Sequence, residues 1–429
     1  MRHPKERGPH RRGMSRREFL RRSAGTAAAF SSVGAFLAAC KASNPNDQPG
    51  PPGKSSGAGL PFPLARRDSP VTWPLTDDDP PVDSDLEPEK DATLKIYNWD
   101  AYIWKKLGKD FSEQFDCKVE FSTFDNIDQA LAKIRTGQVD FDVYFPDPSF
   151  LGRLIYGKLI RPLNLDYIPN LKNCWPQLQD PFYDRGSHYS VPYVIYSTGI
   201  GWRNDHVSED PYRMDNPYDL YWNAKYKGKV NLLDDVREAV SMALLRNGIT
   251  DLNTEDPKDI DTARKDLVEL VDLVAVKIDV NDYTTLPEGS SFIHQAWSGD
   301  LISAQYYLPK GTPITTMSYW YPPDGKGPIG SDNMAILKGG KNPVLAHHFL
   351  NFMLDKKNAY ANFANFVGYQ PPQNDIDADR LVTDQVIPKN LTSCVVRESD
   401  FDVGFSELEL SPDGDALWHS AFQELQAGD

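Results

Sequence analysis

Cysteine is scarce in this chain of 429 residues, which contains only four. Three of them, Cys117, Cys174 and Cys394, lie far apart, and none belongs to a CxxC pair. A zinc site or a disulfide framework is therefore not indicated. Two interpretations remain open: one bridge with a free thiol, or three buried thiols. We expect neither a metal nor a cofactor.

The motifs of two enzyme classes are also missing. The chain has no GxxxxGK[ST] and no HExxH sequence. His347 and His348 are adjacent on a predicted helix, where neighbouring side chains point about 100° apart, so a shared metal is disfavoured. We interpret them as one core and one surface histidine. Nothing singles out an enzyme, and we predict that the chain is not one.

Basic residues are outnumbered, since 46 Lys and Arg stand against 61 Asp and Glu, for a net charge of −15. The first 39 residues carry a local charge of +7, which leaves −22 on the rest. An acidic body of this kind repels phosphate backbones, so nucleic acid is disfavoured as a partner and a cationic partner is favoured. The hydrophobic content of 40% indicates a folded protein, and the length predicts at least two domains.

No apolar run is long enough for a confident membrane span. Arg16 and Arg17 precede an uncharged stretch from Ala24 to Ala39, which leads to Leu37-Ala38-Ala39-Cys40. This pattern resembles a twin-arginine export signal that ends in a lipobox. We predict a signal peptide at 1–39 and lipidation of Cys40, which anchors the protein to a membrane on the extracytoplasmic face, in the periplasm or at the cell surface. The alternative, a transmembrane anchor, is weaker because a span needs about 20 strongly apolar residues.

The segment after Cys40 is rich in proline. Residues 41–91 hold 11 of the 34 prolines, together with Gly, Ser and acidic runs. This composition predicts a solvated tether over 40–92. A second interpretation is that Leu60 to Leu75, with Phe62 and Trp73, packs on the folded domain as a strap. Both interpretations remain open.

Strand and helix patterns alternate after the tether. We predict strands at Thr93–Trp99, Lys118–Ser122 and Phe141–Pro146, and helices through Ile103–Phe115 and Ile127–Ile134. Such alternation is typical of βαβ units with a parallel sheet, so the fold class is α/β.

Later segments add two long extended runs and one helix start. The runs are Tyr189–Trp202 and Gly330–Leu337. Asn342-Pro343 predicts a helix with Asn as the N-cap and Pro at the first helical position.

Aromatic and acidic residues occur together after predicted strands. The segments are Asn98–Tyr102, Pro146–Phe150 and Ala296–Asp300. Ligands of open α/β sheets bind outside the carboxyl ends of strands, aromatic faces attract cations, and carboxylates bind ammonium groups. Taken singly, each residue is better explained as a core aromatic or a turn aspartate.

Asp235-Val236-Arg237-Glu238 opens another apolar helical stretch. Asp at the N-cap with Glu at N3 is a capping-box arrangement, which explains both carboxylates without a ligand. A cap that faces a cleft is also able to receive a cation, so the two roles are compatible.

The order of these motifs, NWDAY, FDVYFP, VPYVIYSTGIGW, LLDDVREAVSMAL, QAWSGD, SDNMAI and GYQPPQ, resembles the spermidine/putrescine-binding proteins of ATP-binding-cassette importers. The similarity runs from about Thr93 to about Gln373. It implies a two-lobe, periplasmic-binding-protein-like fold of type II, with a mixed sheet flanked by helices in each lobe and crossover hinge strands. We expect lobe 1 at 93–196 plus 330–377, and lobe 2 at 197–329 plus 378–429.

The resemblance also implies a set of ligand-binding residues in the cleft between the lobes. Aromatic side chains flank the methylene chain of a polyamine, and acidic ones hold its amino groups. Carried over to this sequence, the residues are Trp99, Tyr102, Asp147, Asp235, Glu238, Trp297, Asp332 and Tyr369.

Some positions depart from the family pattern. Asp147 stands where the family usually has serine, Ser149 where it commonly has tyrosine, and Gly330 where it has tryptophan, with Trp320 or Tyr321 as candidates to fill that gap. Asp400 aligns loosely with a glutamine of the family.

The resemblance therefore implies a monomeric binding protein that captures spermidine, putrescine or a related cationic amine and delivers it to the permease of an ATP-binding-cassette importer. One alternative is the same fold with a different small molecule. A weaker one is an exported hydrolase that uses a pair such as Asp235 and Glu238.

Overall fold

The computed structural model describes residues 62–137 and 139–428, and within these ranges nine strands form one connected sheet. Its order is β2-β1-β3-β9-β4-β7-β5-β6, with β8 paired to β4. The strands are β1 (Thr93–Trp99), β2 (Lys118–Phe124), β3 (Val143–Tyr144), β4 (Val191–Arg203), β5 (Val230–Leu232), β6 (Lys277–Ile278), β7 (Ile293–Trp297), β8 (Met317–Trp320) and β9 (Ile329–Ile336).

The predicted parallel pairing is right for only part of this sheet. β1 pairs in parallel with β2 and β3, and β5 pairs in parallel with β6 and β7. The long strands β4 and β9 are antiparallel to each other and to their other partners. The class is α/β as predicted, and the sheet is mixed because β4 and β9 run antiparallel to their neighbours.

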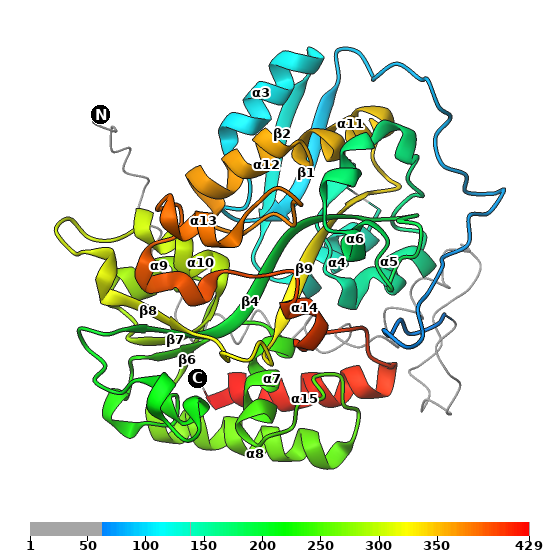
Figure 1. Cartoon of the computed structure of the whole chain (residues 1–429). Coiled ribbons are helices and arrows are strands. Elements are labelled where there is room, and N and C mark those ends of the chain that lie inside the picture. The colour runs from blue at the N-terminus through cyan, green and yellow to red at the C-terminus, as the bar shows by residue number, and fades with distance from the viewer. Residues whose placement is uncertain (1–61, 138, 429) are drawn as a thin grey trace, which may run out of the picture.

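Helices cover both ends of the sheet (Figure 1). Near β1 and β2 lie α3, α11 and α12, while α7, α8 and α15 pack together at the other end. The helices are α3 (Lys105–Phe115), α4 (Ile127–Arg135), α5 (Leu151–Tyr156), α6 (Pro176–Gln179), α7 (Val236–Arg246), α8 (Pro257–Val274), α9 (Asp282–Glu288), α10 (Ser298–Ser303), α11 (Pro343–Met353), α12 (Lys356–Asn362), α13 (Ala378–Thr383), α14 (Asp400–Val403) and α15 (Pro412–Gly428).

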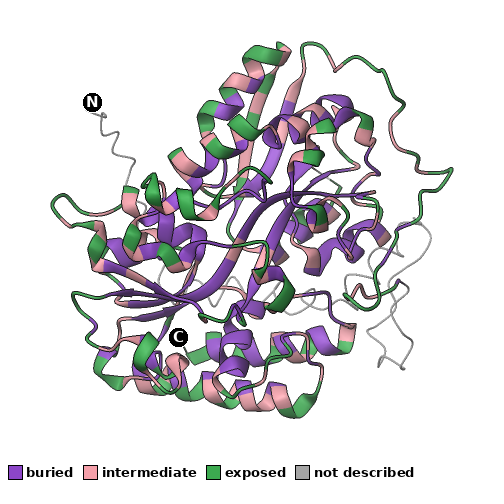
Figure 2. Cartoon of the chain, viewed as in Figure 1, coloured by how far each residue is buried: buried purple, intermediate pink, exposed green. Residues whose placement is uncertain are grey.

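Strand β4 joins the two ends of the sheet. Its first part, from Val191 to Ser197, pairs with β9, and its second part, from Thr198 to Arg203, pairs with β7 and β8. Figure 2 shows β4 buried along almost its whole length, while the outer helices expose one face. One continuous strand therefore connects two separately packed regions.

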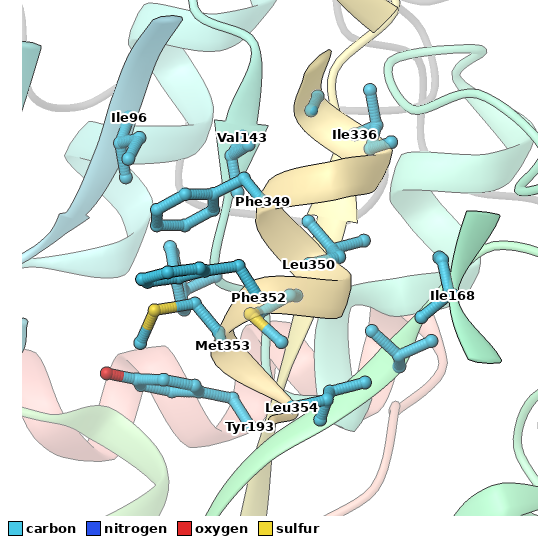
Figure 3. Packing of buried hydrophobic residues seen from close by; sticks show 14 of the residues in the cluster. Ile96, Val143, Ile168, Tyr193, Ile336, Phe349, Leu350, Phe352, Met353 and Leu354 are labelled. Atoms are coloured by element: carbon cyan, nitrogen blue, oxygen red, sulfur yellow. The ribbon is translucent and has the colours of Figure 1, made fainter. Parts of the chain in front are cut away.

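Each region has its own apolar core. In the first, Phe349 and Phe352 of α11 pack edge to face on Phe111 of α3, and Ile96 and Val143 belong to the same cluster (Figure 3). A second large cluster joins α7, α8 and α15, with the Trp418 side chain fully buried. Burial of these side chains contributes roughly 1.5 to 3 kcal/mol each to the stability of the fold.

Helices α4, α5 and α15 meet through an ionic group that we call the clasp, made of the buried residues Arg153, Glu409 and Asp415 together with the more exposed His419 and Asp128. Arg153 lies 3.0 Å from Glu409 and 3.1 Å from Asp415, and all three side chains are at least nine-tenths buried. His419 of α15 reaches Asp128 of α4 at 3.3 Å. The clasp ties the carboxyl-terminal helix to the region that contains β1.

The segment before β1 packs on this region as well. Phe62, Val71 and Trp73 are buried in its core, and the Trp73 indole donates to the Tyr183 carbonyl at 2.9 Å. Of the two interpretations of this segment, the structure favours the strap for residues 62–75. Arg66 also donates to the Glu409 carbonyl at 3.0 Å, so the strap contacts the same carboxyl-terminal segment as the clasp.

Helix α11 begins at Pro343 with Asn342 at the N-cap position, as predicted. The Asn342 side chain makes no capping hydrogen bond, because its amide donates to Asp142 and to the Thr93 carbonyl. Glu89, from the predicted tether, accepts from the amides of Val344 and Leu345 instead. A carboxylate at a helix N-terminus is stabilised by the helix dipole.

The structure shows how far the three later cysteines and the two adjacent histidines are buried. Cys174 and Cys394 are buried free thiols, and Cys117 is a partly buried one. His347 is fully buried, whereas His348 is only partly buried. Burial lowers the pKa of His347 to about 4, which is consistent with a neutral core histidine.

Candidate functional site

A cavity of about 400 Å³ opens where β1, β4, β7 and β9 approach the N-terminus of α7. All eight residues that the sequence predicts for a ligand site line this cavity, although they come from segments as far apart as β1 and the turn after α12. They are Trp99, Tyr102, Asp147, Asp235, Glu238, Trp297, Asp332 and Tyr369.

The lining is strongly acidic. Its two arginines, Arg67 and Arg237, face eight acidic residues, namely Asp100, Asp125, Asp147, Asp235, Glu238, Asp300, Asp332 and Glu407. Carboxylates removed from water are costly unless cations or hydrogen-bond donors compensate them. Because acidic residues outnumber basic ones in the lining, the cavity favours a cationic ligand over a neutral or anionic one.

Asp332 lies in the middle of the cavity wall, on β9. The Tyr102 hydroxyl donates to its Oδ2 atom, and its side chain is 7% exposed. Burial raises the pKa of Asp332 to about 7, although the hydrogen bonds of Tyr102 and Tyr196 act in the opposite direction. A cation placed beside Asp332 would restore its charged form.

Asp235 and Glu238 stand at the start of α7, and only one of them is a cap. Asp235 Oδ1 accepts from the amides of Arg237 and Glu238, at 2.8 and 3.1 Å. The Glu238 side chain does not complete the expected capping box, because its Oε1 accepts from Trp297 Nε1 at 2.6 Å and from Thr198 Oγ1 at 2.8 Å. Glu238 therefore faces the cavity rather than the helix end.

Both carboxyl groups of this helix start have raised pKa values. Burial is the main cause, and it raises the pKa of Asp235 to about 6. For Glu238, burial and the charge of Asp235 together raise the pKa to about 8. In the empty cavity these groups hold protons at pH values where an exposed carboxyl group is ionised.

Asp147 follows β3, where it accepts from the backbone amide of Ser149 at 2.7 Å and from the Ser149 hydroxyl. Burial raises its pKa, and these hydrogen bonds act against that rise. Ser149 and its neighbour Phe150 both line the cavity. With serine at 149, where the family commonly has tyrosine, Phe150 still supplies an aromatic ring to the lining. The serine hydroxyl also donates a hydrogen bond to the Asp147 carboxylate.

Four aromatic rings make edge-to-face contacts in one wall. The Tyr369 ring lies 5.4 Å from Tyr102 and 5.9 Å from Tyr196, and Tyr196 lies 6.5 Å from Trp297. Trp99 lies three residues before Tyr102 in the chain, and its ring centroid is 4.6 Å from that of Phe124. Aromatic faces of this kind attract cations and cover methylene groups.

Tyr196 fills the place that Gly330 leaves open. The two residues are direct partners in the β4–β9 ladder, and a Cβ atom at residue 330 would lie 2.6 Å from the Tyr196 ring. Trp320 and Tyr321, the candidates from the sequence, are buried in the core and absent from the cavity lining. The aromatic wall at this point therefore comes from the neighbouring strand.

Sequence reasoning missed Tyr196 and Glu407. Tyr196 belongs to the predicted extended run Tyr189–Trp202. The glycine at 330, where the family has tryptophan, was the sequence signal that another residue supplies the aromatic ring there. Glu407, rather than Asp400, is the acidic residue of the carboxyl-terminal segment that lines the cavity. Asp400 Oδ2 instead accepts from the Arg397 amide at 2.7 Å, as a local turn residue.

Other kinds of site were sought over residues 62–137 and 139–428. Within them, no group of three or more His, Cys, Asp and Glu side chains has an arrangement that would hold a metal ion. The helices in the same ranges include none that is both long and apolar enough to cross a membrane.

Comparisons with known proteins identify the family of the chain. The family model of bacterial extracellular solute-binding proteins matches residues 106–389. The spermidine/putrescine-binding periplasmic protein of Escherichia coli is 30% identical over 340 residues, which cover 78% of this chain and 92% of that protein. A putrescine/cadaverine-binding protein of Pseudomonas aeruginosa is 27% identical over 65% of this chain and 79% of its own length.

Solved structures share the fold. A spermidine/putrescine transporter substrate-binding protein of Streptococcus pneumoniae superimposes with a TM-score of 0.62 at 24% identity, covering 79% of this chain and 99% of that one. A lipoprotein of Treponema pallidum gives a TM-score of 0.64 at 19% identity, with coverage of 78% and 99%.

Proposed function

Since the chain belongs to the bacterial extracellular solute-binding proteins, we propose that it captures a polyamine such as spermidine or putrescine in the cavity and delivers it to an ATP-binding-cassette importer. The observation that carries the proposal is the lining itself, with eight acidic residues, two arginines and a wall of aromatic rings. Relatives named for spermidine, putrescine and cadaverine binding support the same ligand class.

The ligand in this proposal is held by two kinds of contact. Asp332, Asp235 and Glu238 bind its ammonium groups by charge-assisted hydrogen bonds, and Asp147 adds a carboxylate beside β3. Trp99, Tyr102, Trp297 and Tyr369 cover the methylene chain and attract the charge. No covalent step is required, so the protein acts as a carrier.

Ligand capture in this proposal involves closure of two lobes. Lobe 1 comprises 93–196 plus 330–377, and lobe 2 comprises 197–329 plus 378–429. The hinge then includes the middle of β4, where its pairing passes from β9 to β7. Closure around a bound ligand traps it, and opening at the permease releases it.

Export and anchoring complete the proposal. Residues 1–39 direct export by the twin-arginine route, and a lipid on Cys40 holds a monomeric protein at the extracytoplasmic membrane face. All of these residues lie outside the described ranges, and 40–61 then link the lipid to the strap. Replacement of Cys40 by alanine should release the protein from membranes into the soluble extracytoplasmic fraction.

Titration calorimetry of the purified full chain with putrescine, spermidine and spermine tests the ligand class. We expect heat of binding and a rise in melting temperature for at least one of the three. If none gives heat or a thermal shift at millimolar concentration, the polyamine assignment fails and a different small molecule becomes the better candidate.

The same samples separate carrier from hydrolase. A carrier returns the bound amine intact after hours of incubation, as measured by mass spectrometry of the released ligand. Conversion of the amine would favour the alternative in which Asp235 and Glu238 act as an acid and base pair.

A further inference from the structure

The two arginines of the cavity lining differ in their surroundings. Arg237 of α7 is 7% exposed, and its guanidinium donates to the carbonyls of Leu408 and Leu252, at 2.7 Å each. Its charge also acts to lower the pKa of Glu238 in the cavity wall. Arg67 belongs to the strap and is exposed to solvent, yet it lines the same cavity. Arg67 therefore lies at an edge of the cavity, where a side chain can face both solvent and ligand.

A short turn of the strap holds Arg67 in place. Arg66 and Ser69 exchange two backbone hydrogen bonds of 3.0 Å each, so Arg67 and Asp68 form the tip of a closed turn. A two-residue connection of this kind leaves the backbone little freedom. The neighbouring Arg66 side chain is fixed as well, because its Nη2 donates to the Glu409 carbonyl at 3.0 Å.

The strap that carries this turn is bonded to the loop after α6. The Val71 amide donates to the Phe182 carbonyl, and the Arg185 amide donates to the Val71 carbonyl, both at 2.8 Å. The Trp73 indole donates to the Tyr183 carbonyl at 2.9 Å. Phe182 and Tyr183 themselves line the cavity. The strap and this part of the cavity wall are therefore joined by hydrogen bonds, which fixes the turn relative to the wall.

The Arg67 side chain reaches from the strap to the carboxyl-terminal segment. Its Nη2 donates to the Phe401 carbonyl of α14, and its guanidinium lies 5.6 Å from the centroid of the Phe182 ring. Phe401 and Phe182 both line the cavity, although they belong to segments far apart in the sequence. Arg67 thus bridges the two segments that form one end of the cavity, which we call the strap end.

The charge of Arg67 is not neutralised by the chain. Among residues 62–137 and 139–428, no carboxylate forms an ion pair with its guanidinium, which contacts a neutral carbonyl and a ring instead. Such partners satisfy N–H donors, but they leave the positive charge in place. The strap end is therefore electropositive, whereas the rest of the lining is acidic.

We propose that Arg67 is a specificity-determining residue, which disfavours an ammonium group at the strap end and thereby favours a short diamine over a longer polyamine. This inference rests on the proposed function, and it adds a choice among amines that the acidic lining alone does not provide. A short diamine can place both ammonium groups among the carboxylates. A longer chain with further ammonium groups occupies more of the cavity, including the end where Arg67 repels them.

A repulsive contact of this kind is an ordinary source of specificity. A binding site discriminates between two ligands by the difference in their affinities, and an unfavourable charge contact with one ligand contributes as much as an attractive contact with the other. Because Arg67 is exposed, solvent and salt partly screen its charge. The expected effect is therefore a shift in the relative affinities of amines, with binding retained for each of them.

The test is titration calorimetry of the full chain with putrescine and with spermine, which gives the ratio of the two affinities. Arg67→Gln keeps a donor for the Phe401 carbonyl and removes the charge. It should improve spermine relative to putrescine by about threefold to tenfold. Arg67→Lys keeps the charge and should retain the wild-type ratio. Arg213→Gln, at an exposed arginine that pairs with Asp210 outside the lining, is the matched control and should behave as wild type.

Ionic strength separates charge from shape. The difference in ratio between wild type and Arg67→Gln should shrink when salt is raised from about 0.02 M to about 0.5 M, because the Debye length shortens over this range. An effect of side-chain size would not respond to salt. If Arg67→Gln does not fold, as judged by thermal unfolding, Arg67→Met removes the same charge and takes its place in both measurements.

The outcomes distinguish this inference from the proposed function. An unchanged ratio in a folded Arg67→Gln variant refutes the inference while amine binding stands. A shift of equal size in Arg67→Lys, or a difference that persists at high salt, assigns the effect to side-chain shape and also refutes it. Tighter binding of γ-aminobutyrate than of putrescine by wild type would show that Arg67 attracts a carboxylate, which refutes it as well. Absence of any amine binding by wild type overturns the proposed function and this inference together.

Discussion

The clasp and the cavity both bury carboxylates, but they compensate them differently. In the clasp, Glu409 and Asp415 share Arg153, and the charges of these two acids raise its pKa even though burial acts to lower it. In the cavity, Asp332 and Glu238 are bound by hydroxyl and indole donors and by no cation within hydrogen-bond distance among the described residues. The clasp carboxylates have a cation beside them in the free protein, although burial raises the pKa of Glu409 to about 7, whereas the cavity carboxylates would gain a cation from the proposed ligand.

The difference separates carboxylates that depend on a neighbouring cation for the stability of the fold from carboxyl groups that have no such cation. A buried ion pair that loses one partner leaves an uncompensated charge, which is strongly destabilising. A buried carboxyl group without a cation remains protonated, at little cost to the fold, until a cation arrives. Under the proposed function, the same residue types thus stabilise the fold in the clasp and bind the ligand in the cavity.

The largest effect is expected for Arg153→Met, which removes the cation of the clasp. Glu409 and Asp415 would then lie buried without compensation, so the free energy of unfolding should fall by roughly 3 to 5 kcal/mol. Chemical denaturation measures this. The matched control is Lys109→Met, which breaks an exposed pair with Glu113 and should cost less than about 1 kcal/mol. A loss of similar size in the two variants would contradict the distinction.

Asp332→Asn should weaken ligand binding without lowering the stability of the free protein. Spermidine affinity is expected to fall by about 2 to 5 kcal/mol, since an ammonium in the cavity would lose its central charged partner. The stability of the free protein should not fall, because burial already disfavours the charged form of Asp332. Calorimetry and thermal unfolding of one preparation measure both quantities. Unchanged affinity in a folded variant, compared with the exposed control Asp324→Asn, would move the ligand away from β9.

A smaller effect concerns pH and the stability of the free protein. Asp235, Asp332 and Glu238 have folded pKa values of about 6, 7 and 8, all above their ordinary values. The folded state therefore holds these protons more tightly than the unfolded state does. Their stabilising contribution is fully present below about pH 4 and is lost as pH rises through 6 to 8.

The expected loss between pH 5.5 and 8.5 is at least about 1 kcal/mol, because a pKa change of one corresponds to about 1.4 kcal/mol. Excess spermidine should abolish much of it, which thermal unfolding with and without the amine measures. His419 provides an internal contrast. Burial lowers its pKa, but Asp128 and Asp415 raise it to about 9, so its contribution is fully present below about pH 6.5, is lost as pH rises from there through 9, and should not respond to spermidine. Equal pH profiles with and without amine would contradict the comparison.

The sequence was sufficient to predict much of the fold. Period-two and helical patterns predicted β1 and α3 to within two residues, since their apolar faces repeat locally, and Asn342-Pro343 predicted the start of α11. The mixed pairing of the sheet was not visible in those patterns, because the direction of β4 and β9 depends on contacts between residues more than a hundred positions apart.

The candidate site also has residues that the sequence predicted and residues that it missed. Eight predicted residues line one cavity because the motif order carried their positions, although their roles in binding remain predictions. Glu407 was missed because the carboxyl-terminal segment has little local pattern, and its place depends on Arg237 and Ser241. The helix cap by Glu89 was missed for the same reason, since the segment before β1 is positioned by packing rather than by its own periodicity.

The contact between Tyr196 and Gly330 couples two positions that lie 134 residues apart in the chain. A large side chain at 330 has room only if residue 196 becomes small, so the two sites are expected to change together during evolution. For protein engineering, this means that the aromatic wall can be moved from one strand to its neighbour by a paired exchange, whereas either exchange alone creates a collision or a void. Compensated double substitutions here would change the shape of the cavity wall, with the carboxylates left in place.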